Sequence, residues 1–486
     1  MVNLICAYYS NKQITIQAIN WRNTGNILEK LSAVKRTVIG IGISAYNRVV
    51  AGFFLPNFVN ICAADSLELL MIESKMNCIC LEKNYNGVEG STSTDLILEN
   101  TIVQNLLKKE KGYIMPYRNS PKIDRLADEL GVKVLANSGS LVDKLEQKAF
   151  FTKLLAKCKI EPVPGEIVEI DKIDSKIVER WQKKYKKPVV LQLADLPKGG
   201  GVGMFLLDKK KDYDFFQKKL AFFRRKGYFL KKARIARYIK GEAPSITCCL
   251  TRHGLLLSAL RARPIGIKSL VGENKSGAFC GHDWFYKMPE WAKAEAEKMA
   301  TKIGRELKLL GYKGVFGLDF LIDNKAKKIY PTECNPRHLG PEPVSSLAQM
   351  EMGIVPLEVY DILEHMDIPY FFDFAKTTKD ELRPLNCSQL LLFNRTGKTI
   401  KVEKEVAAGV YKLSGGKFSF LRPGFANWDI KESFEFIITD RVPKKGKLIK
   451  PGGKILRLVF KRPVIESRYK LLPEIEELVE GIYQSI

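Results

Sequence analysis

The sequence predicts an α/β protein with three successive parts. Residues 1–137 alternate short apolar strands with helical stretches, as in a layer of strands covered by helices. Residues 138–380 begin with a helical stretch and continue with strand–turn–strand units. Residues 381–486 are rich in predicted strands and end in a helix from Pro473. The 486 residues, of which 45% are hydrophobic, suffice for about three domains with cores of their own.

The first part is predicted from its strands and from one well-marked helix. Strands are expected at 38–44, 77–81, 113–116 and 133–137, and helices near 95–110 and 120–130. The later helix has Ser120 in the capping position, Pro121 in its first turn and Gly131 just past its end, where each residue type is favoured. Its ends are therefore well defined.

A glycine pattern in this first part is one candidate nucleotide site. The segment VIGIGISA gives Gly40-x-Gly42-x-x-Ala45 after a predicted strand, and Asp65 follows twenty residues later. This spacing fits a dinucleotide-binding fingerprint, in which glycines let the backbone approach a pyrophosphate. Short patterns of this kind recur by chance, so the fingerprint is kept only as an alternative.

Two acids on a predicted hairpin form the second candidate. Residues 314–322 are expected to form one strand and 328–334 the returning strand, with a lysine-rich turn between them. If the turn is centred near Ala326, Asp319 lies opposite Glu333, and Asn335 follows two residues later. Pro331 removes a backbone donor, which suits an edge strand better than a central one.

The chemistry of these side chains indicates a hard cation. Asp319 interrupts an apolar strand, where an unpaired charge would be costly, whereas Asp323 is expected to be a solvated turn residue. Oxygen ligands without histidine or cysteine suit Mg²⁺, with Mn²⁺ as an alternative. Magnesium held by one or two carboxylates usually carries phosphate oxygens as well, so the hairpin predicts a nucleotide site.

The run G-x-D-F followed by E-C-N-P-R resembles the metal-binding end of the ATP-grasp superfamily. The resemblance covers roughly residues 138–372. It implies a Rossmann-like lobe at 1–137 that binds no dinucleotide, a two-lobed ATP-grasp domain at 138–380 and a C-terminal α/β extension at 381–486. It also implies that Asp319, Glu333 and Asn335 ligate the magnesium of Mg-ATP, while Arg337 faces the transferred phosphoryl group or the acceptor.

The same resemblance implies a set of nucleotide contacts. Lys148, with Lys144 as an alternative, would reach the phosphates, and a glycine-rich loop between two strands in 187–207 would cover them. This loop lacks the G-x-x-x-x-G-K-[ST] pattern of a P-loop. Gln192 stands where many members have a lysine, and Ala236 where many have an acid. The remaining implied contacts are Gly199, Gly200, Gly201 and Gly203 in the loop, Arg237, Tyr238 and Ile239 at the adenine, and Glu242 at the ribose.

A second predicted hairpin, at 245–251 and 255–263, contributes two more candidate site residues, both arginines. Arg261 and Arg263 fall on one face of its second strand, and in this family that position would approach the γ-phosphate or an acyl phosphate. A helix is expected at 289–310, with Pro289 near its start and Gly311 after its end.

The resemblance implies a carboxylate–amine ligase that forms an acyl phosphate from ATP and releases ADP. Its substrates would be a small-molecule or peptide carboxylate and an amine. The run ECNPRHLGPEPV also resembles biotin carboxylases, so a carboxylase-like or kinase-like enzyme is the first alternative. A nucleotide-binding module without turnover, suggested by Gln192 and Ala236, and a basic nucleic-acid-binding protein are the others.

The composition of the chain disfavours several other classes of protein. No export signal or apolar run long enough for a membrane span is found, so a cytoplasmic protein is expected, with a homodimer left open. Ten scattered cysteines and four dispersed histidines disfavour a zinc or redox enzyme. The net charge is +25, and residues 141–240 hold 26 Lys and Arg against 12 Asp and Glu. Their basic runs KKYKK, KKK and FFRRK lack regular aromatic interleaving, which disfavours nucleic acid as a partner.

Overall fold

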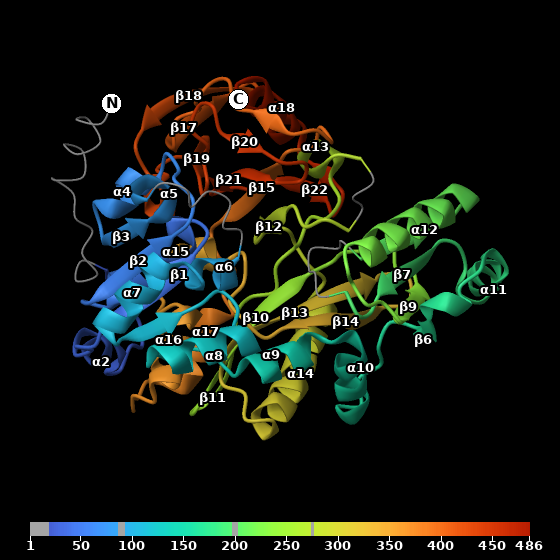
Figure 1. Ribbon diagram of the computed structural model, residues 1–486, viewed down its shortest axis with the longest axis horizontal. Coiled ribbons are helices and arrows are strands. Elements are labelled where there is room, and N and C mark those ends of the chain that lie inside the picture. Colours follow the sequence, from blue (N-terminus) through green and yellow to red (C-terminus); the bar gives the residue numbers. More distant parts are fainter. Residues whose placement is uncertain (1–18, 86–92, 197–202, 274–276) are drawn as a thin grey trace.

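A computed structural model of the chain describes residues 19–85, 93–196, 203–273 and 277–486. Its strands form an N-terminal sheet, a central sheet, the sheet of a smaller projecting lobe and a C-terminal sheet, besides two short ribbons (Figure 1). Apolar residues of the N-terminal, central and C-terminal parts share one large core. Within the described residues, no helix is both long and apolar enough to cross a membrane.

The N-terminal sheet is parallel, with the order β3-β2-β1-β4-β5. This confirms the predicted α/β layer. The sequence analysis does not predict strand β2, although Pro56 and Asn57 form a turn directly before it. The strands are β1 (Val38–Gly42), β2 (Phe58–Cys62), β3 (Asn77–Cys80), β4 (Tyr113–Met115) and β5 (Lys133–Val134). The helices are α2 (Ile27–Ser32), η2 (Ala45–Arg48), α3 (Ala51–Phe54), α4 (Leu69–Glu73), α5 (Leu81–Asn84), α6 (Thr94–Leu98), α7 (Thr101–Glu110) and α8 (Pro121–Leu130).

The ends of α8 are as predicted. The Ser120 hydroxyl accepts a hydrogen bond from the Ile123 amide, and Gly131 adopts the left-handed conformation that ends the helix. A residue with a Cβ is strained in that conformation, which explains the glycine.

The space beyond β1, where a dinucleotide would lie, is filled by protein. A Cβ on Gly40 would come within 2.5 Å of the Phe58 ring, so close packing explains this glycine without a ligand. The Glu68 carboxylate accepts hydrogen bonds from the backbone amides of Arg441 and Val442, at 2.7 and 3.2 Å. Asp65, the acid of the fingerprint, pairs with Lys444 at 2.5 Å. The C-terminal part therefore occupies the carboxyl end of β1 and β2.

A broken helix connects the N-terminal sheet to the smaller lobe. The single helical stretch expected from Ser138 is two helices, α9 (Gly139–Glu146) and α10 (Lys148–Lys157). Between them Gln147 is extended, with φ −68° and ψ 122°. The break turns the chain so that Lys148 becomes the first residue of a new helix.

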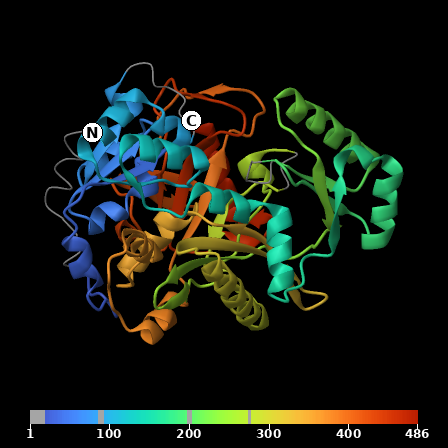
Figure 2. The same cartoon turned by 60° about the horizontal axis from the view of Figure 1, so that its bottom comes forward.

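The small lobe, residues 165–240, projects from the body and has a core of its own. Its antiparallel sheet has the order β6-β9-β7-β8. The predicted strand–loop–strand unit is confirmed as β7 and β8, although Gly199, Gly200 and Gly201 lie outside the described residues. Figure 2 shows its two long helices on the side of the sheet turned away from the body. The elements are β6 (Gly165–Glu169), η3 (Ile170–Lys172), α11 (Ser175–Tyr185), β7 (Val189–Leu193), β8 (Met204–Leu207), α12 (Lys210–Arg225) and β9 (Lys232–Arg237).

The central sheet carries the acidic hairpin. Its order is β11-β10-β13-β14, so Pro331 lies on an edge strand, as its missing donor requires. The second strand expected to reach 263 ends at Leu257. The central strands are β10 (Ser245–Thr251), β11 (Gly254–Leu257), β13 (Gly314–Asp323) and β14 (Lys328–Asn335). The helices of this part are α13 (Lys268–Val271), α14 (Glu290–Leu309), α15 (Glu342–Glu351), α16 (Leu357–Met366) and α17 (Phe374–Glu381).

The C-terminal sheet has the order β12-β15-β21-β19-β17-β18. It is rich in strands and ends in α18, which begins at Pro473 as predicted. Its first strand comes from residues 281–283, so the C-terminal part is built into the central part. The strands are β12 (Gly281–Asp283), β15 (Ser388–Phe393), β17 (Gly409–Ser414), β18 (Lys417–Arg422), β19 (Glu435–Thr439) and β21 (Lys454–Phe460). The remaining elements are β16 (Ile400–Lys401), η4 (Asn427–Asp429), β20 (Leu448–Ile449), β22 (Ile465–Ser467), β23 (Lys470–Leu471) and α18 (Pro473–Gln484).

Candidate functional site

The hairpin β13–β14 places Asp319 directly opposite Glu333, which confirms the predicted register. The turn itself is tighter than expected, because Asp323 pairs with Lys328. A regular ladder from that turn would place Asp319 opposite Thr332. A bulge between Asp319 and Phe320 shifts the register by one residue, and the Thr332 hydroxyl donates to the Asp319 carbonyl at 3.1 Å. The bulge is therefore what brings the two carboxylates onto one face.

Asp319 is buried beside a guanidinium. Its carboxylate forms an ion pair with Arg263 and accepts a hydrogen bond from the Asn335 amide at 3.4 Å. Burial raises the pKa of the Asp319 carboxyl, the Arg263 guanidinium opposes this rise, and the neighbouring Glu333 carboxylate adds to it. The acid that interrupts the apolar strand is therefore compensated by a cation, as an inward-facing charge must be.

Glu333 is paired with the predicted phosphate-binding lysine. The Lys148 ammonium lies 3.2 Å from a Glu333 carboxylate oxygen, although 185 positions separate the two residues in sequence. Burial tends to raise the pKa of Glu333, but Lys148, Arg263 and Arg337 outweigh it and hold the pKa below its usual value. The alternative, Lys144, instead lies over the Phe150 ring, with its nitrogen 4.9 Å from the centroid. Of the two candidate lysines, only Lys148 joins the acidic pair.

Arg337 is held by acceptors on all three nitrogens. It donates to Glu146 at 3.1 Å, to the Tyr117 hydroxyl at 3.0 Å and to Asn335 at 2.8 Å. Asn335 therefore links Asp319 to Arg337 through its two amide atoms. Glu146 also accepts from Arg118 at 2.9 Å. These contacts place Arg337 beside the acidic pair, and they also fit a structural arginine that ties the hairpin to α9.

The structure separates the two arginines that the sequence placed on one face. β11 ends at Leu257, and the following segment is irregular apart from bridges at Arg261 and Ala262. Arg263 reaches Asp319, whereas Arg261 donates to the Ser258 hydroxyl at 3.3 Å and lies over the Trp284 ring. Burial lowers the pKa of the Arg261 guanidinium to about 10, although its charge still acts on Asp319.

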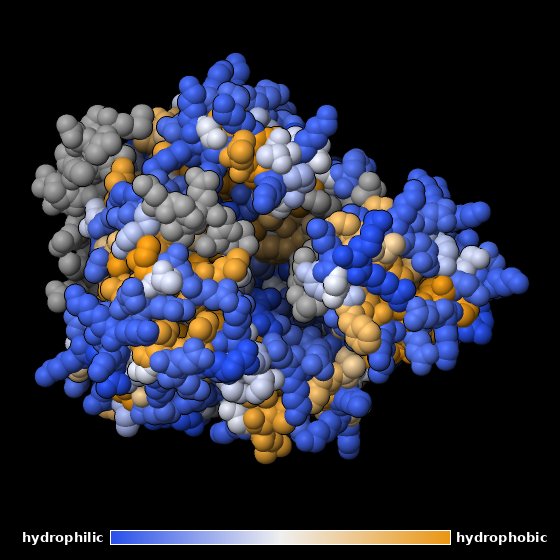
Figure 3. Space-filling model, viewed as in Figure 1, coloured by the Kyte–Doolittle hydropathy of each residue, from blue (hydrophilic) through white to orange (hydrophobic). Residues whose placement is uncertain are grey.

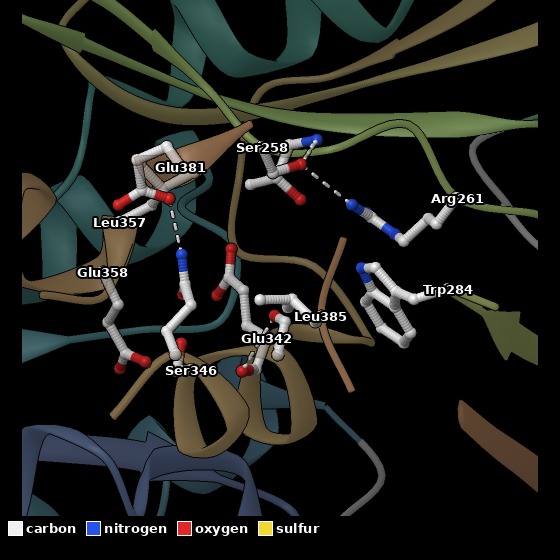
Figure 4. A pocket seen from close by; sticks show the side chains of 12 residues that line it. Ser258, Arg261, Trp284, Glu342, Ser346, Leu357, Glu358, Glu381 and Leu385 are labelled. Carbon is white, nitrogen blue, oxygen red and sulfur yellow. Dashed lines mark hydrogen bonds between the residues drawn. The ribbon is translucent and has the colours of Figure 1, made fainter. Parts of the chain in front are cut away.

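Arg261 lines a small polar cavity behind the site, shown in Figure 4. Its volume of about 10 Å³ corresponds to one water molecule. Several buried polar atoms on the lining residues have no hydrogen-bond partner in the protein, namely Thr247 Oγ1, Trp284 Nε1, Glu342 Oε1, Glu358 Oε1 and Glu381 Oε1. The cavity is therefore suited to an ordered water and is too small for a substrate.

The predicted adenine segment lies where the small lobe meets the hairpin. Ala236 and Ile239 form a small apolar cluster with Val163 and Tyr330. Arg237 forms a 2.6 Å ion pair with Asp323, whose side chain is only 16% exposed, so the prediction of a solvated turn acid at Asp323 is wrong. The position is buried because the small lobe closes against the turn.

C-terminal residues border the same segment, which sequence reasoning missed. The Tyr238 hydroxyl lies 2.9 Å from that of Tyr469, and Arg468 donates to the Gly241 carbonyl at 2.8 Å. Glu242 accepts from Tyr286 at 3.0 Å, and burial raises the pKa of the Glu242 carboxyl. No local pattern marks these partners, because they come from elements far away in the chain.

The remaining predicted residues flank the loop of the small lobe. Gln192 lies on β7 opposite Arg234 of β9, so the neighbouring strand supplies a cation beside the position where the resemblance to ATP-grasp proteins implies a lysine in many members. Gly203 precedes β8, close to Leu193 and Leu196. In the view of Figure 3, the surface is hollowed between this lobe and the body of the protein.

The side chains of Asp319, Glu333 and Asn335 fit a magnesium–nucleotide complex better than a metal ion that is bound by the protein alone. No group of three or more His, Cys, Asp or Glu side chains that could hold a metal ion occurs in the described parts of the chain. Two opposed carboxylates with the Asn335 amide, one ligand each, leave about half of an octahedral shell to oxygens from outside the protein, which phosphates supply.

Comparison with known proteins adds the fold class. No family model matches the sequence, and no curated protein matches it. The biotin carboxylase domain of Hydrogenobacter thermophilus 2-oxoglutarate carboxylase, in complex with Mg-ADP, ADP and bicarbonate, aligns with a TM-score of 0.58 and 15% identity, over 88% of this chain and 86% of that one. Biotin carboxylase from Campylobacter jejuni aligns with 0.56 and 13%, over 87% of both chains.

A second kind of enzyme has the same fold. N5-carboxyaminoimidazole synthase from Aspergillus clavatus, in complex with ADP and 5-aminoimidazole ribonucleotide, aligns with a TM-score of 0.55 and 12% identity, over 92% of this chain and 99% of that one. The chain therefore has an α/β ATP-grasp-like fold, and its structural relatives are carboxylases and synthetases.

Proposed function

We propose that the protein is an ATP-dependent ligase that activates a carboxylate as an acyl phosphate and joins it to an amine. The observation that supports this most is the opposition of Asp319 and Glu333, each paired with a cation, on a hairpin of an ATP-grasp-like fold. Carboxylates held with neighbouring cations fit a site that must accept both Mg²⁺ and phosphate.

In this proposal Asp319, Glu333 and Asn335 hold the magnesium of Mg-ATP, which screens the phosphate charge when bound. Lys148 and Arg263 lie against the carboxylates and can turn their donors toward phosphate oxygens. Arg337 lies beside Asn335, where it can stabilise charge on the phosphoryl group during transfer to the carboxylate. The amine then attacks the acyl carbon and displaces phosphate, so no side-chain nucleophile is required.

The proposal is tested by ADP release. Purified protein with Mg-ATP is offered a panel of carboxylates with and without amines, and ADP is measured by an enzyme-coupled assay. ADP formation that requires both partners supports the ligase. ADP formation with bicarbonate and biotin supports the carboxylase-like alternative, which the H. thermophilus and C. jejuni structures make the second candidate. ADP formation with a single acceptor supports a kinase-like enzyme, and ATP binding without turnover supports a nucleotide-binding module.

ATP should stabilise the protein against heat and NAD should not. A ligand that binds only the native state adds roughly 2.7 kcal/mol to the free energy of unfolding at a hundredfold excess over its dissociation constant. Differential scanning fluorimetry with each nucleotide and Mg²⁺ measures the shift. A shift with NAD alone would mean that the ends of β1 and β2 open to a dinucleotide in spite of the Asp65–Lys444 pair.

Lys148→Met should weaken ATP binding by about tenfold or more, because the side chain that pairs with Glu333 loses its charge. Lys144→Met is the matched control, since Lys144 lies on the preceding helix and over an aromatic ring. Isothermal titration with Mg-ATP compares the two. Equal losses of affinity would show that Lys148 is not a phosphate-binding residue.

The assembly and location also belong to this proposal. The H. thermophilus domain is a dimer, and a homodimer remains an expectation for this chain, as does a cytoplasmic location.

A further inference from the structure

The basic runs of the sequence gather on the small lobe. KKYKK (183–187), KKK (209–211) and FFRRK (222–226) lie on α11, on α12 or at their ends. Residues 165–240 contain 21 Lys and Arg against nine Asp and Glu, which is a net charge of +12. About half of the chain's charge of +25 therefore lies in 76 of its 486 residues.

The helices α11 and α12, which carry the basic runs, lie on the far side of the small lobe from the body. The apolar sides of the two helices, including Trp181 on α11 and Phe216 and Phe223 on α12, are buried in the core of the small lobe. Both helices cover the side of the sheet that is turned away from the body (Figure 2). Their polar sides therefore form an outer surface, and in Figure 3 the lobe shows hydrophilic residues with apolar ones between them.

One exposed face of α12 alternates aromatic and basic side chains. Phe215 and Phe222 are 39% and 43% exposed and lie seven residues apart, which is about two helical turns or roughly 10 Å. The Lys219 ammonium between them is 5.5 and 5.8 Å from the two ring centroids. We call this face, together with Lys226 just past its end, the α12 stripe, and its members are Phe215, Lys218, Lys219, Phe222, Arg225 and Lys226.

In the part of the chain that the structure describes, the cations of the α12 stripe have no acidic partners. Across the described residues, none of its four basic side chains forms an ion pair, whereas neighbouring Arg224 pairs with Asp171 at 2.7 Å. Just beyond the helix, Phe229 is 76% exposed and the Lys231 ammonium lies 4.6 Å from its ring centroid. Exposed rings flanked by uncompensated cations thus continue past the end of α12.

We propose that the α12 stripe binds single-stranded nucleic acid. Unpaired lysines and arginines attract phosphates, and exposed rings between them can stack on bases of any sequence. The sequence disfavoured this partner because FFRRK shows no alternation when written out. The helix creates the alternation, since residues three, four and seven apart share one face.

The composition of the stripe distinguishes this partner from two others. A membrane-bound helix presents a continuous apolar face, but the apolar face of α12 is buried and its exposed rings are separated by cations. The centre of a protein–protein interface is depleted of lysine. A single nucleic-acid strand presents phosphates to the basic side chains of the α12 stripe and bases to its phenylalanine rings. It therefore matches both kinds of side chain.

This inference goes beyond the proposed ligase and is tested independently of it. A fluorescein-labelled oligothymidylate of about 20 nucleotides, longer than the roughly 4–16 that a small single-strand-binding module covers, is titrated with the full chain while anisotropy is recorded at several salt concentrations. We expect saturable binding that weakens with salt. Lys218→Glu/Lys219→Glu/Arg225→Glu should abolish it near 0.1 M salt, roughly the physiological range. Phe215→Ala/Phe222→Ala should weaken it by at least about tenfold with an unchanged salt slope.

Matched variants elsewhere control for charge and for loss of an aromatic ring. Lys298→Glu/Arg305→Glu/Lys308→Glu makes the same charge change on exposed positions of α14. Phe434→Ala removes a ring that is 41% exposed and lies 5.5 Å from Lys412. Both should bind like the wild type, and circular dichroism checks that every variant is folded.

Several outcomes would overturn the proposal. These are absence of binding by the wild type near 0.1 M salt, an equal loss in the α14 variant, or no effect of the two phenylalanine substitutions. Tighter binding to phosphatidylserine vesicles or to polyglutamate, with the oligonucleotide displaced, would assign the surface to a membrane or to an acidic protein instead.

Discussion

Asp319→Asn combined with Glu333→Gln is expected to abolish Mg-dependent ADP formation while the protein remains folded. The variant removes both charges of the opposed pair and keeps the shape of the side chains. Metal-assisted charge stabilisation is worth several kcal/mol, so a loss of about a thousandfold or more is expected. The measurement is the rate of ADP release over a range of Mg²⁺ concentrations.

Two other acids provide the control for this variant. Glu161 and Glu351 are exposed and pair with Lys328 and Lys461, so Glu161→Gln/Glu351→Gln makes the same chemical change away from the site. It should retain wild-type turnover. If the Asp319/Glu333 variant kept the magnesium dependence of the wild type, the metal would have to lie elsewhere.

Arg337→Ala is expected to lower ADP formation by about a hundredfold, while ATP affinity falls much less. A donor that acts on the transferred group in the transition state typically contributes on the order of 3 kcal/mol. Turnover, ATP affinity and melting temperature are measured on the one variant.

The structure supplies a control for the other interpretation of Arg337. Arg118 shares the Glu146 carboxylate with Arg337 and also pairs with Asp143. If Arg337 acts only by balancing Glu146, Arg118→Ala should reduce turnover equally. Parallel losses of melting temperature and ATP affinity in Arg337→Ala would likewise assign it a structural role.

The acidic hairpin could be predicted because its signals are local. Strand alternation and the turn residues placed Asp319 opposite Glu333, and the missing donor of Pro331 indicated an edge strand. The bulge at Thr332 was not visible in the sequence. The predicted turn centre near Ala326 lies half a residue later than the observed centre. The one-residue bulge offsets this difference, and the predicted pairing of Asp319 with Glu333 is therefore correct.

The partners of the site residues could not be predicted, because long-range packing determines them. Lys148 reaches Glu333 only because the helix breaks at Gln147. Glu146 and Tyr117 lie 191 and 220 positions from Arg337 in sequence. Arg261 was assigned to the same face as Arg263 because the strand appeared to continue, whereas it ends at Leu257.

The fate of the carboxylate oxygen tests the central claim most directly. Carboxylates that carry isotopically labelled oxygen are incubated with the protein, Mg-ATP and amines, and the released phosphate is analysed by mass spectrometry. Transfer through an acyl phosphate leaves one labelled oxygen in the phosphate that accompanies ADP. Unlabelled phosphate with every carboxylate that supports turnover, or release of AMP in place of ADP, would contradict the assignment.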